Sequence, residues 1–504
     1  MIHAGQFAVL KEKVDLPDYR HLDLRDGWIL SYHPKLQVFY DEGKDILLLG
    51  LAWQVLPERK EPTEEIRRLP DAYGREDILR MEESWCGRYV LVWRGLVFTD
   101  TCAQLDVFYS KDGISSDCAI LAAQAGLPAK LYAPEKGIVM NWMPGPLTHY
   151  EGIYKLLPSQ LYEIATGQTH PRQLLASFCP EIPDDEERIR AFIALFDNSL
   201  HNMRKLIPDK KLLIALTGGY DSRSLFALAK HAGIHFEAYT LEYEGIYEDD
   251  ISIPRTLCQR TGVAHHYVPR NKADFNPNLE DEYRIHTSGL ILDEDRLFYA
   301  HGQYQKLIEE FGEVAFLRSS IWENVIEYFQ RTFAGNGPGF DFYDWFGVKE
   351  GSVEKRSLEA YFDWEMQHPQ PKLAASDVFL WEQREGCWLS AIESGFDLLD
   401  HAISLQPANC RYFLSMLQQF PREERKVKYH QARIIARACG EIADVAFGSD
   451  KRKNENVFTV LWAKLKRGIH RLRTIGIQKT WKTYVSIIRK QREKRQLQKK
   501  VGKK

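Results

Sequence analysis

Several features that would place this 504-residue chain in a simple class are missing from its sequence. No long uncharged apolar run is present, so we expect no membrane-spanning helix. The first residues carry no basic stretch followed by an apolar block, so we expect no signal peptide. The eight cysteines are scattered and form no Cys-x-x-Cys pair, which argues against a zinc site or a disulfide framework. The sequence therefore predicts a cytoplasmic protein with reduced thiols.

The composition is that of a folded protein with large cores. Hydrophobic residues make up 44% of the chain and aromatic residues 12%, which excludes a disordered protein. The length suggests roughly three domains at ~150 residues each. The formal net charge of −3 hides an asymmetry, because residues 461–504 hold sixteen Lys or Arg and the single acid Glu493. The rest of the chain is correspondingly acidic.

The segment Thr217–Ser222 lies where an apolar strand turns into an amphipathic helix. We predict the strand over Leu212–Leu216 and a helix from about Asp221 until Gly233. Its two glycines have no Cβ, so backbone N–H groups can approach an anion closely, and the helix N-terminus adds partial positive charge. Asp221 supplies a carboxylate for Mg²⁺ held between phosphate oxygens. The segment contains neither a Walker Gly-Lys-Ser/Thr nor a Gly-x-Gly-x-x-Gly dinucleotide motif.

This segment resembles the Ser-Gly-Gly-x-Asp-Ser pyrophosphate loop of the ATP pyrophosphatase superfamily, with Thr217 in place of the first Ser. Enzymes of that superfamily split ATP into AMP and pyrophosphate, so the resemblance implies ATP and Mg²⁺ as cofactors and Asp221 as the metal ligand. The nucleotide-binding residues that it implies are Leu216, Thr217, Gly218, Gly219, Asp221, Ser222 and Leu241. An ordinary strand-to-helix turn with capping residues is the alternative interpretation.

The first 180 residues are typical of a strand-rich domain. Apolar runs predict strands over 46–53, 89–93 and 96–100, with a hairpin-like turn at Arg94-Gly95 between the last two. The later apolar run over 117–123 is interpreted as a further strand.

The order of short motifs in this region is similar to the N-terminal amidotransferase half of asparagine synthetases. The motifs are Gly87-Arg88-Tyr89, a hairpin, Thr99-Asp100 and then Val107-Phe108-Tyr109. The resemblance implies an Ntn-type, β-rich amidotransferase-like domain over residues 1–180.

One departure from that pattern concerns the nucleophile. Class II glutamine amidotransferases need a Cys directly after the initiator Met, and this chain has Ile2 and His3 there. Cys86 is the candidate substitute nearby, but a thiol beside an apolar strand is more often a packed core residue. We therefore expect the domain to be inactive and predict no glutaminase activity.

A polar, acidic joint at 180–187 predicts a linker and the start of a helix over about 188–206. Strands then alternate with helices, with a second strand over 236–241, which predicts a parallel α/β sheet. We expect an ATP-pyrophosphatase domain of the asparagine synthetase type over 184–455, helical in its C-terminal part. The predicted fold class is thus α/β, or α+β for the whole chain.

A first landmark shared with the asparagine synthetase family follows the predicted strand over 236–241. In the family an acidic residue starts a helix there, and the next strand begins with Gly and then His. This chain has Asp249 and Asp250, then Gly262 and His265. Charge placement at a helix N-terminus and a polar strand edge are the simpler interpretations.

A second landmark, 316–324, occupies the place of the family's Gly-Glu-Gly-x-Asp-Glu-Leu-Phe-Gly-Gly-Tyr segment. Only Glu323 and Tyr328 match it, and the Asp that would be a second Mg²⁺ ligand falls on Trp322. Three alternatives stay open: Glu323 takes the metal role, Arg318 and the neighbouring serines contact phosphate, or the activity has drifted.

A third landmark spans Lys428–Lys451, and the run 442–451 within it fits the end of the family's synthetase domain. Lys451 falls at the spacing of the lysine that, in the family, stabilises charge on the pyrophosphate and on the tetrahedral intermediate. The resemblance thus implies Lys451 and Glu323 as catalytic residues. A solvated surface lysine is the alternative for Lys451.

The resemblance implies carboxylate activation. A carboxylate attacks the α-phosphate of Mg²⁺·ATP to give an acyl-adenylate and pyrophosphate, and ammonia or an amine then displaces AMP, largely through alignment and charge stabilisation. Aspartate is the default acid, as in amino-acid biosynthesis. Relatives without glutaminase, such as β-lactam synthetases, lasso-peptide cyclases and amidating enzymes of surface polysaccharides, make another acid the alternative. A homodimer is compatible with the sequence.

Two other functions compete with this one. A nucleotide-binding scaffold without turnover is favoured by Trp322 in the second metal position. An RNA-modifying pyrophosphatase is suggested by the loop and by the basic tail over 456–504, but the amidotransferase-like half counts against nucleic acid as a partner. Apolar residues at three- and four-residue steps make this tail a predicted amphipathic basic helix. It could contact a membrane surface, bind nucleic acid or dock on the acidic body.

Overall fold

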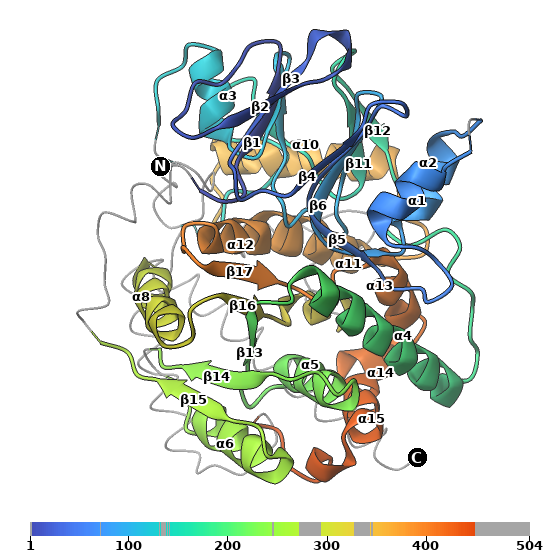
Figure 1. Cartoon of the computed structure of the whole chain (residues 1–504), viewed down its shortest axis with the longest axis vertical. Coiled ribbons are helices and arrows are strands. Elements are labelled where there is room, and N and C mark those ends of the chain that lie inside the picture. Colours follow the sequence, from blue (N-terminus) through green and yellow to red (C-terminus); the bar gives the residue numbers. More distant parts are fainter. Residues whose placement is uncertain are drawn as a thin grey trace.

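The computed structural model describes residues 3–70, 72–130, 132, 138, 140, 142–243, 246–271, 294–326, 343 and 346–448. These residues build two six-stranded antiparallel sheets and one five-stranded parallel sheet, flanked by helices (Figure 1). The mixed α/β fold predicted from the sequence is confirmed. The basic tail and Lys451 lie outside the described residues.

The two antiparallel sheets come from the N-terminal third of the chain. The first has the order β10 (Tyr154–Lys155), β8 (Phe108–Ser110), β9 (Gly113–Ser115), β1 (Phe7–Leu10), β3 (Ile29–Tyr32) and β2 (Arg20–Asp23). The second has the order β12 (Gln168–Pro171), β11 (Gln160–Glu163), β7 (Leu96–Thr99), β6 (Trp85–Trp93), β5 (Ile46–Gln54) and β4 (Val38–Asp41). The short helices of this region are η1 (Arg25–Gly27), α1 (Pro62–Arg68), α2 (Arg75–Glu82) and α3 (Cys118–Gln124).

These sheets stack face to face between helical layers. Because side chains alternate along a strand, Leu47 and Leu49 of β5 pack between the two sheets, whereas Ile46 and Leu48 pack under α1 and α2. Covering on both faces explains why β5 is apolar at nearly every position. The helix α3 covers the outer face of the first sheet (Figure 1).

The interpretation of 117–123 as a strand was wrong. Residues Cys118–Gln124 form α3, and the Asp117 carboxylate caps it by accepting the Ala119 N–H at 2.8 Å. A short apolar run cannot be assigned to helix or strand by its periodicity, and the N-cap aspartate was the local signal for a helix.

The C-terminal two-thirds of the described chain contains the parallel sheet. Its order is β15 (His265–Val268), β14 (Glu237–Leu241), β13 (Lys211–Ala215), β16 (Val314–Leu317) and β17 (Ala402–Leu405). The helices are α4 (Asp185–Leu206), α5 (Tyr220–His231), α6 (Asp249–Thr261), α8 (Glu294–Phe311), η3 (Ser320–Val325), α10 (Val353–Gln367), α11 (Ala375–Phe379), η4 (Leu380–Leu389), α12 (Ser390–Phe396), α13 (Arg411–Gln418), α14 (Arg422–Lys426), α15 (Tyr429–Ala438) and η5 (Gly440–Ile442). The run η4 is a π-helix and continues directly into α12.

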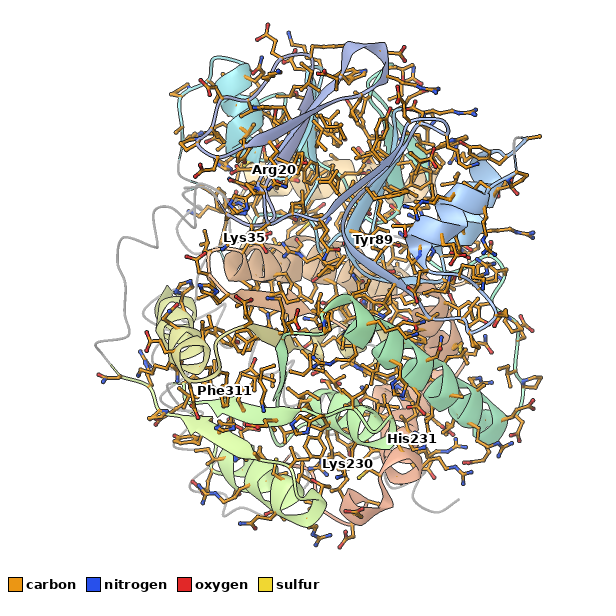
Figure 2. The ribbon with its side chains drawn as sticks, viewed as in Figure 1. Arg20, Lys35, Tyr89, Lys230, His231 and Phe311 are labelled. Atoms are coloured by element: carbon orange, nitrogen blue, oxygen red, sulfur yellow. The ribbon has the colours of Figure 1, made fainter. Side chains whose placement is uncertain are left out.

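The run α11–η4–α12 lies between the antiparallel sheets and the parallel sheet (Figure 1). Its side chains bond to the N-terminal part, since Trp381 Nε1 donates to the Thr101 carbonyl at 2.7 Å. Arg88 makes a bidentate ion pair with Asp397, at 2.6 and 2.7 Å. Lys35, above α12 in Figure 2, pairs with Asp400 at 2.5 Å. The two parts of the chain thus share a polar interface as well as a hydrophobic core.

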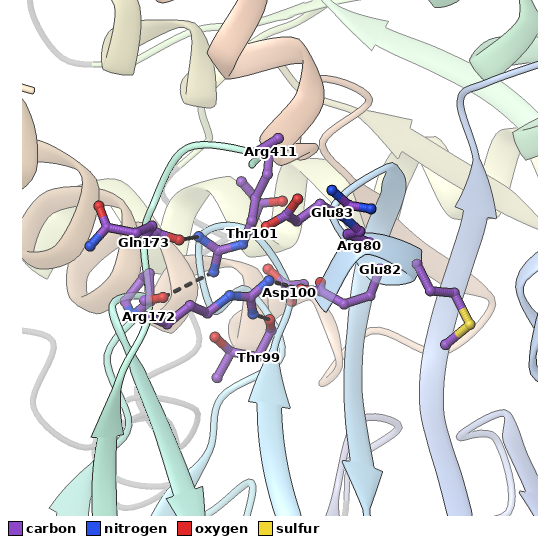
Figure 3. Close-up of polar contacts among 12 residues, drawn as sticks. Arg80, Glu82, Glu83, Thr99, Asp100, Thr101, Arg172, Gln173 and Arg411 are labelled. Carbon is purple, nitrogen blue, oxygen red and sulfur yellow. Dashed lines mark hydrogen bonds and ion pairs between the residues drawn. The ribbon is translucent and has the colours of Figure 1, made fainter. Parts of the chain in front are cut away.

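A second buried polar group lies where the two parts of the chain meet (Figure 3). Arg172 forms an ion pair with Glu82, and both side chains are at most 1% exposed. Arg411 lies beside them and donates to the carbonyls of Leu174 at 3.0 Å and Pro158 at 2.9 Å. Burial and the neighbouring Arg411 hold the pKa of Arg172 well below its usual value. Among the described residues, no other ion pair has both side chains as deeply buried as Arg172 and Glu82.

Among the residues that the structure describes, no helix is both long and apolar enough to cross a membrane.

Candidate functional site

The Thr217–Ser222 segment connects β13 to α5 at the carboxyl end of the central strand of the parallel sheet. The strand register ends at Leu216, whose N–H donates to the Tyr239 carbonyl at 2.9 Å. The loop then closes on itself, because the Thr217 N–H donates to Ser222 Oγ at 3.1 Å and the two hydroxyls are 3.1 Å apart. Ligands of open α/β sheets bind at the carboxyl ends of the strands. The loop therefore stands in the usual ligand position.

Gly218 lies closer to its neighbours than a side chain would allow. Its N–H donates to Asp250 Oδ1 at 3.0 Å, and its carbonyl accepts the Gly448 N–H at 3.0 Å. A Cβ atom would lie 2.9 Å from the Asp249 carbonyl oxygen and 3.2 Å from Asp250 Oδ1. Asp250, which the sequence placed only at a helix start, thus fixes the loop directly to α6.

We expect Gly218→Ala to weaken ATP binding by about 10- to 100-fold, because the added methyl group pushes the loop away from α6 and displaces its N–H groups. Isothermal titration with ATP measures this. Gly440→Ala is the matched control, since a Cβ there meets no atom within 4 Å. Equal ATP affinity in both variants would contradict the importance of the close approach.

The N-terminus of α5 directly follows the two glycines of the loop. Gly219 is the N-cap residue, and no side chain caps the helix there. The first N–H groups of a helix lack partners within the helix, so an uncapped end favours an anion. The phosphate-binding role predicted for Thr217, Gly218, Gly219 and Ser222 is compatible with this geometry.

Asp221 lies on the first turn of α5 and faces Lys428 and Gln431, to which the sequence analysis gave no role. Its carboxylate accepts hydrogen bonds from Lys428 Nζ at 2.9 and 3.0 Å and from Gln431 Nε2 at 2.8 Å. Lys428 adopts the left-handed conformation, with φ at 61°, at the start of α15. The sequence separation of 207 residues between Asp221 and Lys428 left no local signal for this pair.

The side chains around Asp221 bear on the metal-binding role predicted for it. In the described part of the chain, no group of three or more His, Cys, Asp or Glu side chains is arranged to hold a metal ion. Mg²⁺ in nucleotide sites is commonly held by one or two carboxylates together with substrate phosphates. Asp221, a quarter exposed at an uncapped helix end, fits such a single-carboxylate role when ATP supplies the other oxygens.

The segment that leads toward Lys451 is fastened to the loop. Arg223 is fully buried and donates to the carbonyls of Val445 at 2.6 Å and Ala446 at 3.2 Å. The ring of Phe447 stacks on that of Tyr220, with centroids 3.6 Å apart. Residue 448 is the last described one, so the catalytic role implied for Lys451 stays a prediction.

Glu323 and Trp322 of η3 have different surroundings. Trp322 is 1% exposed and packs against Phe192 and Phe196 in the main core, so it has no ligand to offer in the second metal position. Glu323 Oε2 lies 3.2 Å from Nε of Arg384 on η4 and is partly exposed. Tyr328 lies outside the described residues.

The carboxyl ends of the next strands carry another ion pair. Arg318, directly after β16, donates to Glu393 on α12 at 2.7 Å, and Gln406, after β17, donates to the same oxygen at 3.0 Å. The sequence analysis considered Arg318 for phosphate binding but did not identify Glu393. Arg318 is engaged by this carboxylate in the structure.

Leu241 ends β14 beside the loop strand and is half-buried, and its implied nucleotide contact stays a prediction. The preceding Thr240 donates its hydroxyl to the Leu216 carbonyl at 2.8 Å and lies 2.9 Å from Nε2 of His265. Burial, with Arg255 nearby, lowers the pKa of His265 to about 4. His265 is therefore neutral near pH 7 and supports the strand ends next to the loop.

Cys86, the candidate substitute nucleophile, lies inside β6. Its thiol is fully buried and contacts the Pro407 carbonyl oxygen at 3.2 Å. Burial raises the pKa of the thiol well above its ordinary value. A buried, protonated thiol is a packing residue and not a nucleophile.

Comparisons with known proteins add little to this geometry. Neither a protein-family profile nor a curated protein sequence matches the chain. Solved structures that it resembles include the NMN synthetase from Francisella tularensis, at 14% identity and a TM-score of 0.21, over 39% of this chain and 92% of that one. Another is the glutamine-dependent NAD+ synthetase from Acinetobacter baumannii in complex with ADP, at 11% identity and a TM-score of 0.22, over 56% and 59% of the two chains. Similarity at this level carries no functional argument, so the function is argued from the site.

Proposed function

We propose that the chain is an ATP-dependent amide-forming ligase of the asparagine synthetase type. It activates a carboxylate as an acyl-adenylate, releases pyrophosphate and transfers the acyl group to ammonia or an amine. The observation that carries the proposal is the uncapped N-terminus of α5, which follows the Gly218 close approach at the carboxyl end of the central parallel strand. Such a helix end binds phosphate through backbone donors.

The side chains around the loop suit the charges of that reaction. Asp221 would hold Mg²⁺, which neutralises charge on the phosphate oxygens when bound. Lys428, 2.9 Å from Asp221, supplies a cation at the same end of α5 and can turn to the pyrophosphate when Asp221 takes the metal. Fixed charges of this kind stabilise the leaving group without costly reorganisation. Lys451 and Glu323 complete the proposed catalytic set.

The N-terminal part of the chain indicates where the nitrogen of the amide comes from. Cys86 is buried in the core with a raised pKa. The chain also has Ile2 where class II amidotransferases have the Cys that attacks glutamine. We therefore infer that ammonia or an amine is the direct nucleophile. Aspartate is the default acid, and an acid from envelope-glycan or peptide metabolism is the alternative. The proposed location is cytoplasmic, with membrane-surface contact through the tail as an additional proposal.

The test is pyrophosphate release from Mg²⁺·ATP by the purified full-length protein. We offer aspartate and a panel of other carboxylates, each with ammonium, with an amine or with glutamine. The expected result is acid-dependent pyrophosphate release that yields amide with ammonium or an amine, and no glutamate from glutamine. Glutamate production by clean protein would contradict the inactive amidotransferase half. Failure of every acid, with ATP bound, would contradict the ligase.

A nucleotide-binding scaffold is the second candidate, and two observations favour it. Trp322 fills the core where a second metal ligand would be needed, and Lys428 already neutralises Asp221. A scaffold would bind ATP in titration and release no pyrophosphate with any acid. The same experiment therefore separates the two functions.

A further inference from the structure

Four carboxyl side chains lie on elements that pack together, namely α5, η3, η4 and α12. They are Asp221, Glu323, Glu385 and Glu393. The first, second and fourth each have a cationic partner: Asp221 has Lys428 at 2.9 Å, Glu323 has Arg384 at 3.2 Å and Glu393 has Arg318 at 2.7 Å. Glu385 is the member of this set for which the described residues offer no ion pair.

Glu385 is also the most deeply buried of the four. It is 0% exposed, and neither of its carboxyl oxygens has a hydrogen-bond partner in the part of the chain that the structure describes. Burying an unpaired ionised carboxylate costs several kcal/mol, so a native protein rarely keeps one without a use. One oxygen of Glu393, Oε2, is buried and unpartnered as well. Three carboxyl oxygens therefore lack donors.

The charges around Glu385 indicate which kind of ligand its carboxyl group would bind. Burial and the nearby carboxylates of Glu323, Asp221 and Glu393 raise the pKa of Glu385 well above its ordinary value, and Arg384 opposes the shift. A metal ion held by protein side chains alone does not fit here, because no group of three ligating side chains is assembled in the described residues. A small cation with several N–H donors would satisfy the free oxygens.

We propose that Glu385 is the binding group for the amino nitrogen of the nucleophile, which it receives as ammonium or as a terminal primary ammonium group. This inference deepens the proposed ligase function by naming the second substrate's class and its place. The amine would enter beside Glu323 and Asp221 and thus next to the phosphate loop. Full burial limits the site to a small or terminal amino group.

The π-helical form of η4 supports a functional position. Glu385 lies in the middle of Leu380–Leu389, and π-helical turns are frequent at functional sites. The same helix carries a natural control, Glu382, which is also 0% exposed. Glu382 Oε1 accepts the Ser159 N–H at 2.9 Å, so its carboxyl group is engaged by the N-terminal part of the chain.

The experiment is calorimetric titration of the full-length protein with methylammonium chloride and ammonium chloride at pH 7. Tetramethylammonium and potassium chloride at equal ionic strength serve as ligand controls. Repeating it in two buffers of different ionisation enthalpy counts protons, because ammonium displaces the proton of Glu385 and releases about one per site.

We expect wild type and Glu382→Gln to bind methylammonium with proton release, and Glu385→Gln to bind it about 10- to 100-fold more weakly without release. Glu385→Met, of similar volume and apolar, is the second variant and should unfold at a temperature no lower than wild type, because it removes an unpartnered polar group. Equal binding by Glu385→Gln, or equal binding of tetramethylammonium, would overturn the proposal.

These readouts need no ATP and therefore separate the two proposals. Methylammonium binding that depends on Glu385, without pyrophosphate release by any acid, would overturn the ligase and leave the amine site. Pyrophosphate release and amide formation with an unchanged KM for ammonium in Glu385→Gln would overturn the amine site and leave the ligase.

Discussion

Asp221→Asn should reduce acid-dependent pyrophosphate release by about 100-fold or more. The substitution keeps the shape of the side chain but removes the charge that would hold Mg²⁺ on the phosphate oxygens and that pairs with Lys428. Losing one fixed charge at a phosphoryl or acyl transition state typically costs a factor of about 10² to 10³. A coupled assay of pyrophosphate under saturating ATP measures the effect.

The matched control is Asp209→Asn at the opposite, amino end of β13, where the side chain is exposed and far from the loop. We expect wild-type turnover from this control. Stability should change little in either variant, because Asp221 is a quarter exposed and partly exposed ion pairs contribute at most about 1 kcal/mol. Wild-type turnover by folded Asp221→Asn would refute the metal role.

Glu82→Leu should lower the free energy of unfolding by about 3 to 5 kcal/mol. The change leaves Arg172 at most 1% exposed and without its carboxylate, beside the second guanidinium of Arg411 (Figure 3). Breaking one side of a buried ion pair is costly because it leaves an uncompensated charge in a low-dielectric interior. Urea unfolding followed by circular dichroism measures the loss.

The double variant Glu82→Leu/Arg172→Met tests the cause. Replacing both charges by apolar groups removes the uncompensated guanidinium, so stability should return most of the way to wild type. The exposed pair of Glu64 and Arg68 on α1 is the comparison, and Glu64→Gln should cost less than about 1 kcal/mol. A double variant as unstable as Glu82→Leu would mean that packing, and not charge, dominates the site.

Local patterns in the sequence were sufficient for the strand and helix around the loop. The apolar run 212–216 and the Gly pair after it specify a buried strand and a tight turn, and the structure has β13 and α5 within two residues of the predicted bounds. The apolar runs 46–53, 89–93, 96–100 and 236–241 likewise correspond to the strands β5, β6, β7 and β14. By contrast, the apolar run after Asp117 forms the helix α3, because a short run fits both a helix and a strand.

The partners of the candidate site could not be predicted in this way. Lys428 reaches Asp221, and Glu393 reaches Arg318, only after the parallel sheet has brought separate strand ends together. Nothing in the spacing of these residues along the chain encodes that meeting. The sequence also cannot show that the Glu385 carboxyl lacks a partner among the described residues, because this depends on which side chains the fold brings near it. The domain limits, Lys451 and the basic tail remain predictions.

The π-helix over Leu380–Leu389 also makes the length of this segment a constraint of its own. Each residue of an α-helix turns the chain by about 100°. A π-helical stretch holds more residues per turn, so it changes the direction in which the side chains of α12 point relative to those of α11. Deleting one residue here would rotate Glu385 relative to Glu393 and turn it away from Glu323. The number of residues in the helix, as much as their identity, therefore decides how Glu385 lies relative to Glu393.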